Sequence, residues 1–223
     1  MKLMIPSIGF SLHFNIKWVL IHWRQIHQGG GMADANDVVG YWLDELGSKG
    51  WYAGGSDLDA IIRERFKDLW WKTYNGANGL WLTYPTGTLA YLILMDQMPR
   101  NMFRGTANSF GSDRQAVAAA KLAIQNGWDL KIDEPARQFF YMPLVHSESL
   151  TDQDRAVRLI LTRMPVEKSR QLPHARAHRK IIRKFGRFPA RNNALSRKST
   201  SQEEAYMLAG GYVVTLRELA QTA

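Results

Sequence analysis

Two short stretches of the chain place arginine beside proline, an arrangement that suits anion binding. Residues 99–101 read Pro-Arg-Asn and residues 189–192 read Pro-Ala-Arg-Asn, and each stretch has a second arginine nearby, Arg104 or Arg187. Proline fixes its own φ and restricts the residue before it, so the backbone direction at these arginines is constrained. Guanidinium groups held in a fixed direction suit bidentate recognition of a carboxylate or a phosphate. We call residues 96–104 the first arginine segment and residues 187–192 the second.

The first arginine segment also contains a carboxylate in an apolar setting. Asp96 lies in the last turn of a predicted helix that is otherwise apolar. A buried carboxylate is unfavourable unless it is paired, and Arg100 or Arg104 is close enough in sequence to pair with it. The pair either ties the helix end to the following loop or positions one arginine for a ligand. Gln97 and Asn101 are further polar candidates in this segment.

A third stretch, residues 141–148, contains a histidine and a glutamate that could transfer protons. His146 and Glu148 follow Pro143 in a predicted loop, and imidazole titrates near neutral pH. Residues i and i+2 do not share a helical face, so direct pairing requires a turn. Ser147 lacks the Gly-x-Ser-x-Gly context of a nucleophile. His146 is therefore either an acid–base group or a hydrogen-bonded structural residue.

His178 is the second histidine of interest. It lies on the apolar face of a predicted helix, one turn before Ile182, and this helix leads into the second arginine segment. A lone histidine on such a face is often a core residue with satisfied hydrogen bonds. Its position before Arg187, Arg191 and Asn192 also makes it a candidate for proton transfer.

The leading hypothesis is that the three stretches converge on one polar cleft that binds a small anion bearing a carboxylate or a phosphate. Asp96 and Glu148 are expected to orient the arginines, and His146 or His178 is available for proton transfer. Whether the site is catalytic stays open. The expected anion ligands are Arg100, Arg104, Arg187 and Arg191.

The composition excludes several kinds of chemistry. The 223-residue chain has no cysteine, which rules out disulfides, thiolate metal sites and cysteine nucleophiles. This composition fits a reducing compartment, and we expect a cytoplasmic location. The histidines and acids show no metal-binding spacing, and neither a phosphate loop nor a Gly-x-Gly-x-x-Gly motif is present. We therefore expect neither a metal nor a cofactor.

The net charge of +9 is concentrated in one part of the sequence. Residues 155–198 contain fourteen Lys and Arg against one acid, Glu167. Such a block binds an anion or nucleic acid, or it forms a solvated helix face. No tryptophan falls inside it, which weakens the nucleic-acid hypothesis. The second alternative is a protein-interaction scaffold with a helical groove, which ranks ahead of nucleic-acid binding.

The rest of the pattern predicts helices separated by Gly and Pro. Asp34 or Asn36 is expected to cap the first helix, and capping boxes are expected over residues 56–59 and 200–203. The apolar helix after Pro85 is expected to end near residue 97, because proline at position 99 disfavours helix in the residue before it. No stretch alternates like a strand. The fold class is all-α, with seven to nine helices in antiparallel pairs.

The N-terminus differs from the rest. Residues 1–31 contain three basic residues and no acid, end in three glycines, and precede a natural-looking start at Met32. We expect this stretch to be a disordered or non-native extension, with residues 32–223 as a single helical domain. A membrane-surface segment is the alternative. No apolar run reaches the length of a membrane span.

The chain resembles a known family through several motifs in order. These are DQMPRNMFRGT at 96–106, FFYMPLVHSESLTDQ at 139–153 and HRKIIRKFGRFPARNNALSRKST at 178–200. They are similar to the bacterial domain-of-unknown-function family numbered 924, over about residues 38–208. The resemblance implies a right-handed α-α superhelix like that of tetratricopeptide repeats, and no activity. This chain departs from the family at Lys180, Ala190 and Ser196, where an acid, a histidine and a glycine are common.

Overall fold

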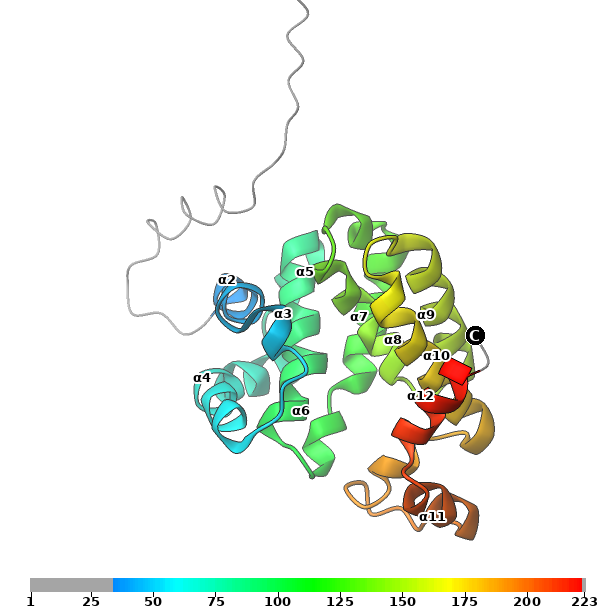
Figure 1. Cartoon of the computed structure of the whole chain (residues 1–223). Helices are drawn as coiled ribbons and strands as arrows, with labels where there is room; N and C mark the ends of the chain where they lie inside the picture. Colours follow the sequence, from blue (N-terminus) through cyan, green and yellow to red (C-terminus); the bar gives the residue numbers. More distant parts are fainter. Residues whose placement is uncertain (1–33, 222–223) are drawn as a thin grey trace, which may run out of the picture. The chain divides into compact units, whose positions relative to one another are not determined.

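The computed structural model describes residues 34–221, and every regular element in that part of the chain is a helix. When consecutive helical turns are joined, the described residues form nine helices, which confirms the predicted all-α class (Figure 1). None of these helices combines the length and apolar character needed to cross a bilayer. The predicted extension over residues 1–31 lies outside the described part.

The first helices begin at a predicted cap. The Asp34 carboxylate accepts hydrogen bonds from the backbone N–H groups of Asn36 and Asp37, which confirms the expected N-cap. The run that follows packs against α5, and α4 packs against α6. The elements are α2 (Ala35–Val39), the π-helical η1 (Gly40–Leu46), α3 (Gly47–Gly50) and α4 (Ser56–Tyr74).

The predicted capping box over residues 56–59 is wrong. Gly55 is the N-cap of α4, no side chain caps this end, and Ser56 is already helical. Asp59 instead lies buried, and its carboxylate accepts hydrogen bonds from Asn101 and Arg104. A guanidinium is a stronger partner for a buried carboxylate than a backbone N–H group, which explains why the cap does not form.

The central helix runs through Pro99 and does not end near residue 97 as expected. It consists of α5 (Pro85–Leu92), the π-helical η3 (Ile93–Gln97) and α6 (Met98–Met102). A proline inside a helix removes one hydrogen bond and crowds the carbonyl four residues earlier, here that of Met95. The π turn widens the helix at this point, and the Ser112 hydroxyl donates to the freed Met95 carbonyl at 2.5 Å.

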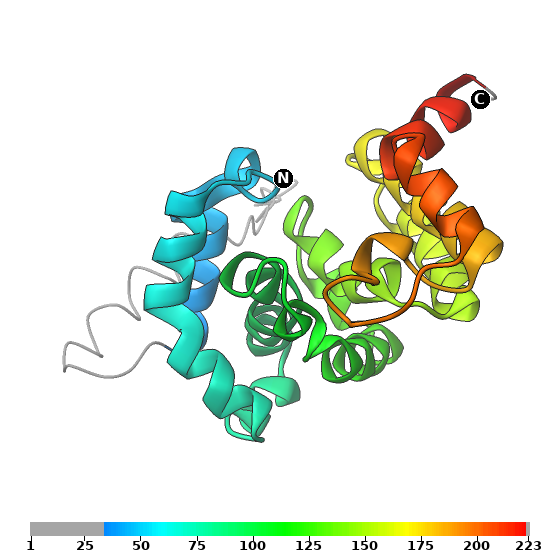
Figure 2. The ribbon, with the colours of Figure 1, turned by 90° about the horizontal axis from the view of Figure 1, so that it is seen from below.

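The core lies around this central helix. In Figure 2 the green helices α5–α7 lie between α2–α4 on one side and α8–α12 on the other. α7 (Asp113–Gln125) packs against α5 and α8 through a stripe of small residues, of which Ala116, Ala120 and Ala123 are fully buried. Trp42, Trp70 and Tyr141 are the largest fully buried side chains of the same apolar cluster.

The C-terminal helices add a separate, smaller apolar cluster. Ile181, Ile182 and Phe188 are buried there, with Tyr206 and Tyr212 packed against them. The predicted capping box over residues 200–203 is confirmed at the start of α11. The remaining elements are η2 (Gly79–Thr83), η4 (Ala107–Phe110), η5 (Trp128–Lys131), η6 (Ala136–Phe140), α8 (Met142–His146), α9 (Leu150–Arg163), α10 (Lys168–Phe185), η7 (Pro189–Arg191), α11 (Ser201–Leu208) and α12 (Tyr212–Gln221).

Candidate functional site

A buried carboxylate and a histidine from two of the predicted stretches form the centre of a polar network. Nδ1 of His146, at the end of α8, lies 2.9 Å from both carboxylate oxygens of Asp96 in the π turn. Asp96 is only 1% exposed, and the side-chain amide of Gln97 also donates to it at 2.5 Å. Because a carboxylate accepts, Nδ1 of His146 carries the proton and Nε2 has the free lone pair.

Two arginines and a second aspartate close this network into a ring. Arg100 lies 3.2 Å from the Asp96 carboxylate and 3.0 Å from that of Asp113. Arg191 donates to the other oxygen of Asp113 at 3.1 Å and to the backbone carbonyl of His146 at 2.8 Å. We call these five residues the Asp–Arg ring. It joins η3, α6, α7, α8 and η7, so residues from all three predicted stretches meet in it.

The ring is formally neutral, because its two carboxylates balance its two guanidinium groups. Burial by itself raises the pKa of Asp96, but Arg100 and His146 outweigh it and hold that pKa below its usual value. Burial, together with the Arg100 cation, lowers the pKa of His146 although Asp96 opposes this shift. His146 is therefore a neutral imidazole at pH 7, and a buried Asp96 carboxylate fixes its tautomer.

The second predicted histidine lies beside the ring. The His178 ring is 6.3 Å from that of His146, and its Nδ1 donates to the backbone carbonyl of His174 at 2.9 Å. Phe188 and Tyr212 pack edge-on against it at 5.4 and 5.1 Å. Burial, with a smaller contribution from His146, lowers the pKa of His178 to about 3. His178 is thus neutral, with the lone pair on Nε2.

Arg191 is held between two aromatic rings at the edge of a pocket. Its guanidinium carbon lies 4.6 Å from the ring centres of both Phe110 and Phe188. The pocket has a volume of about 200 Å³, and we call it the Arg191 pocket. It is lined by His178, Ile181, Phe188, Pro189, Ala190, Arg191, Tyr206, Met207 and Tyr212.

Two of the four predicted anion ligands, Arg104 and Arg187, belong neither to the Asp–Arg ring nor to the Arg191 pocket. Arg104 makes a bidentate pair with Asp59, to which Asn101 also donates. Arg187 makes an equivalent bidentate pair with Glu203, and Asn192 donates to the same carboxylate at 3.3 Å. The structure therefore divides the four arginines between the Asp–Arg ring and two separate clamps, in which bidentate geometry satisfies the guanidinium groups locally.

The expectation that Glu148 orients the motif arginines is wrong. Its carboxylate makes a bidentate pair with Arg197, at 2.7 and 3.0 Å, and also accepts from the backbone N–H of Phe188. Burial raises the pKa of Glu148, but Arg197 and the Phe188 N–H together lower it below its usual value. An ionised carboxylate held in this way fixes the loop before η7 and has no proton to give at neutral pH.

Sequence reasoning missed three residues of the site. Asp113 is the first residue of α7 and bridges Arg100 and Arg191. Phe110, three residues earlier, supports Arg191. A usable signal was present for Asp113, since it adds an acid to a region where unpaired arginines need partners. No signal in the sequence pointed to Tyr212, which follows two glycines near the C-terminus.

Half of the basic side chains in residues 155–198 are paired. Seven of the fourteen form ion pairs with carboxylates, three of them with Asp113, Glu148 and Glu203. The other four are residues of α9 and α10 that pair with Asp129, Asp154, Glu167 and Glu218. The charge concentration seen in the sequence is therefore neutralised in part, mostly by acids outside this block.

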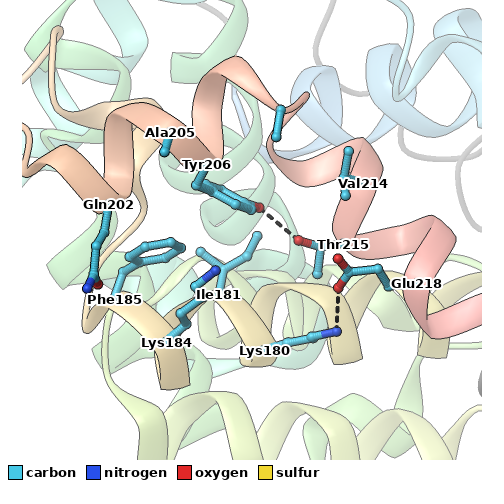
Figure 3. Close-up of a pocket in the computed structure, with 11 residues that line it drawn as sticks. Lys180, Ile181, Lys184, Phe185, Gln202, Ala205, Tyr206, Val214, Thr215 and Glu218 are labelled. Atoms are coloured by element: carbon cyan, nitrogen blue, oxygen red, sulfur yellow. Dashed lines mark hydrogen bonds and ion pairs between the residues drawn. The ribbon is translucent and has the colours of Figure 1, made fainter.

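A second, larger pocket lies between α10, α11 and α12, with a volume of about 540 Å³ (Figure 3). Lys180 pairs with Glu218 at 2.7 Å on one side, and the Tyr206 hydroxyl lies 2.9 Å from that of Thr215. None of the residues predicted to bind or react lines this C-terminal pocket. Within residues 34–221, no group of three or more His, Cys, Asp or Glu side chains is placed to hold a metal ion.

Comparisons with other proteins agree with the resemblance seen in the sequence. Residues 38–211 match the family described as "Bacterial protein of unknown function (DUF924)". The chain is similar to the solved structure of the protein of unknown function ATU0120 from Agrobacterium tumefaciens, with 36% identity and a TM-score of 0.73. The match covers 79% of this chain and 97% of that one. A search of curated proteins gave no match. The chain therefore belongs to the bacterial DUF924 family.

Proposed function

We propose that this protein binds a small monoanion in the Arg191 pocket, and that this monoanion is a carboxylate. The observation that carries the proposal is the guanidinium of Arg191, which is fixed between two aromatic rings and lines the pocket. Its two hydrogen bonds to Asp113 and His146 use two of its five N–H donors. Nε donates to no acceptor among the described residues, which leaves it for a ligand in the pocket that Arg191 lines.

The proposed anion site contains one arginine, Arg191, instead of the four expected from the sequence. Arg104 and Arg187 are engaged by Asp59 and Glu203, and Arg100 bridges the two carboxylates of the ring. Freeing any of these three for a ligand leaves a carboxylate without its partner, which is unfavourable. Of the four, Arg191 lines the Arg191 pocket, and none lines the larger pocket formed by α10, α11 and α12.

The charge of the ring favours a monoanion over a phosphate dianion. Asp96 and Asp113 already neutralise Arg100 and Arg191, and the neighbouring His146 and His178 are neutral. A dianion adds more negative charge beside these carboxylates, with no further cation to offset it. A carboxylate matches the flat guanidinium and adds one charge.

The walls of the pocket indicate a ligand with an apolar body. Ile181, Phe188 and Met207 contribute apolar surface, and the rings of Tyr206 and Tyr212 complete it. A volume of about 200 Å³ is smaller than the ~300–1,000 Å³ of most drug-sized ligand sites. A short aliphatic or single-ring carboxylate fits these limits.

A catalytic role for His146 stays a prediction. Hydrogen bonding of Nδ1 to a buried carboxylate is the arrangement that prepares a histidine to accept a proton at Nε2. His146 does not line the Arg191 pocket, however, and only 14% of its side chain is exposed. The scaffold and nucleic-acid alternatives also stay hypotheses, as do the tetratricopeptide-like superhelix and a cytoplasmic location.

Isothermal titration with acetate, phenylacetate, phenyl phosphate and inorganic phosphate tests the proposal. We expect phenylacetate to bind most tightly, because it has both a carboxylate and an apolar body. Ala190→Leu should fill the pocket and weaken binding about tenfold or more, equivalent to about 1.4 kcal/mol. Arg191→Lys should weaken it by about 10- to 100-fold through loss of the charged fork.

Arg183→Lys is the matched control, because Arg183 is exposed on α10 and lines neither pocket. It makes the same substitution at a surface site and should leave binding unchanged. Equal loss of binding in Arg183→Lys and Arg191→Lys would show that binding does not depend on the position of the arginine in this pocket. Binding that survives Ala190→Leu would also contradict the proposal.

A further inference from the structure

The Arg191 pocket contains a hydrogen-bond acceptor as well as a donor. His178 lines the pocket, and its Nδ1–H is used by the His174 carbonyl, which leaves the lone pair on Nε2. Among the described residues, no donor lies within hydrogen-bonding distance of this Nε2. His178 therefore brings an unpaired acceptor to the pocket that it lines.

Donor and acceptor are held against the same aromatic ring. The Phe188 ring centre lies 5.4 Å from that of His178 and 4.6 Å from the guanidinium carbon of Arg191. The Tyr212 ring centre lies 5.1 Å from that of His178, and the Tyr212 hydroxyl contacts Nδ1 of His174. Both groups are therefore fixed in direction before any ligand arrives, which favours a ligand that engages both.

We propose that the ligand is a small hydroxycarboxylate whose carboxylate binds Arg191 and whose hydroxyl donates a hydrogen bond to Nε2 of His178. This inference rests on the proposed carboxylate site and adds the chemical class of its ligand. A simple carboxylate fills the Arg191 end and leaves the imidazole lone pair unmatched, whereas a hydroxyl satisfies it. A site with a polar group that must be paired discriminates strongly against analogues that lack the partner.

The groups around His178 keep it an acceptor over a wide pH range. It faces His146 from α8, Arg191 from η7 and Tyr212 from α12, and it shares α10 with His174. Burial and the nearby cationic or ionisable groups disfavour a second proton on the ring, and burial keeps the Tyr212 hydroxyl protonated by raising its pKa to about 12. The preference for a hydroxyl should thus hold at mildly acidic pH.

Matched probes test the inference. Phenylacetate is compared with mandelate and 3-hydroxyphenylacetate, which place one hydroxyl at two positions, and with their O-methyl ethers. We expect at least one hydroxylated probe to bind about fivefold more tightly than phenylacetate, the effect of one net hydrogen bond. The gain should disappear in its ether, which cannot donate, and should be equal at pH 7.5 and 5.5, where carboxylates with a pKa of about 4 stay ionised.

The variant His178→Phe keeps a ring between Phe188 and Tyr212 but removes the acceptor. We expect the ratio of the affinities for the hydroxylated probe and for phenylacetate to fall from about five in the wild type to about one in this variant, whatever the change in phenylacetate affinity itself. Tyr212→Phe is the control, since it removes a pocket hydroxyl that already contacts His174, and it should keep the gain. Thermal unfolding of each variant shows whether it is folded before titration.

The outcomes separate the two proposals. Binding of phenylacetate without any gain for a hydroxylated probe would leave the carboxylate site standing and overturn the hydroxycarboxylate assignment. A gain that persists in His178→Phe, or that vanishes at pH 5.5, would overturn it as well. Absence of binding by every carboxylate would contradict the proposed function itself, and this inference with it.

Discussion

The two arginine segments follow the same plan and differ in one respect. Each gives one arginine to the Asp–Arg ring, and each uses its second arginine with an asparagine to hold a separate carboxylate. Asn101 and Arg104 hold Asp59 in the first segment, and Asn192 and Arg187 hold Glu203 in the second. The ring arginines differ, because Arg191 lines a pocket between two rings and Arg100 does not.

This difference separates the arginines that only hold the structure together from the one that we propose binds a ligand. Arg100 contacts two carboxylates and the backbone carbonyls of Asp96 and Ser109, so it connects α6 to α7. Arg191 contacts one carboxylate and one carbonyl and lines the Arg191 pocket. The acceptors around each guanidinium, and its position at a pocket, are properties of the tertiary structure.

The largest expected effect comes from removing the ring arginine of the first segment. Arg100→Met leaves Asp96 and Asp113 without their shared cation, and we expect a loss of about 3–5 kcal/mol in the free energy of unfolding. Urea denaturation followed by circular dichroism measures it. A smaller loss in the free energy of unfolding for Arg100→Met than for Arg104→Met would contradict the view that the ring stabilises the fold more than the Arg104–Asp59 clamp.

A pH effect should reveal the buried His178, which lines the same pocket as Arg191 of the second segment. The pKa of His178 is lowered to about 3 in the folded protein, so the unfolded chain binds more protons below its unfolded pKa of about 6.5. The contribution of His178 to the free energy of unfolding is thus fully present above pH 6.5. It should fall as the pH drops, by up to about 1.4 kcal/mol per pH unit.

Denaturation curves at pH 7 and pH 5 measure this slope. The interval lies above the titration range of the carboxylates, so the histidines dominate, and His146 contributes in the same direction. His178→Phe should show a shallower slope than the wild type. An unchanged slope would mean that the folded protein accommodates a protonated His178.

The clamp of the first segment should matter less than the ring. Arg104 is 53% exposed, and water screens its pair with Asp59. We expect Arg104→Met to lower the free energy of unfolding by about 1 kcal/mol, and urea denaturation at 0.1 and 1 M NaCl gives the value and its salt dependence. A loss similar to that of Arg100→Met would remove the contrast within this segment.

The smallest effect concerns the turn that follows the second segment. Ser196 has a φ of 51°, a conformation that a side chain disfavours and that glycine adopts freely. Ser196→Gly should therefore raise the free energy of unfolding, by about 0.5–1 kcal/mol, as thermal unfolding can measure. Ser199→Gly serves as the comparison, because Ser199 has no positive φ and its hydroxyl accepts from Asn192. Destabilisation by Ser196→Gly would contradict this account of the turn.

The sequence by itself determined the helical class, the caps of two helices and five residues of the site, Asp96, Arg100, His146, His178 and Arg191. Helical periodicity, caps at Asp34 and Thr200 and the small-residue stripe of α7 are local patterns, and local hydrogen bonds and burial enforce them. The repeated arginines beside proline, with Asp96 in an apolar helix, indicated that charged groups would have to pair. These features depend on residues that are close together in the sequence.

The tertiary structure alone decided which charges pair. Pro99 was expected to end its helix, but a π turn and the Ser112 hydroxyl, 17 residues from Met95, satisfy the backbone there. Asp59, Asp113 and Glu203 lie up to 78 residues from the arginines that they hold. Ion pairs act through space over a few ångströms, so packing of the helices, and not spacing along the chain, placed Arg191 at the pocket and Arg104 and Arg187 in separate clamps.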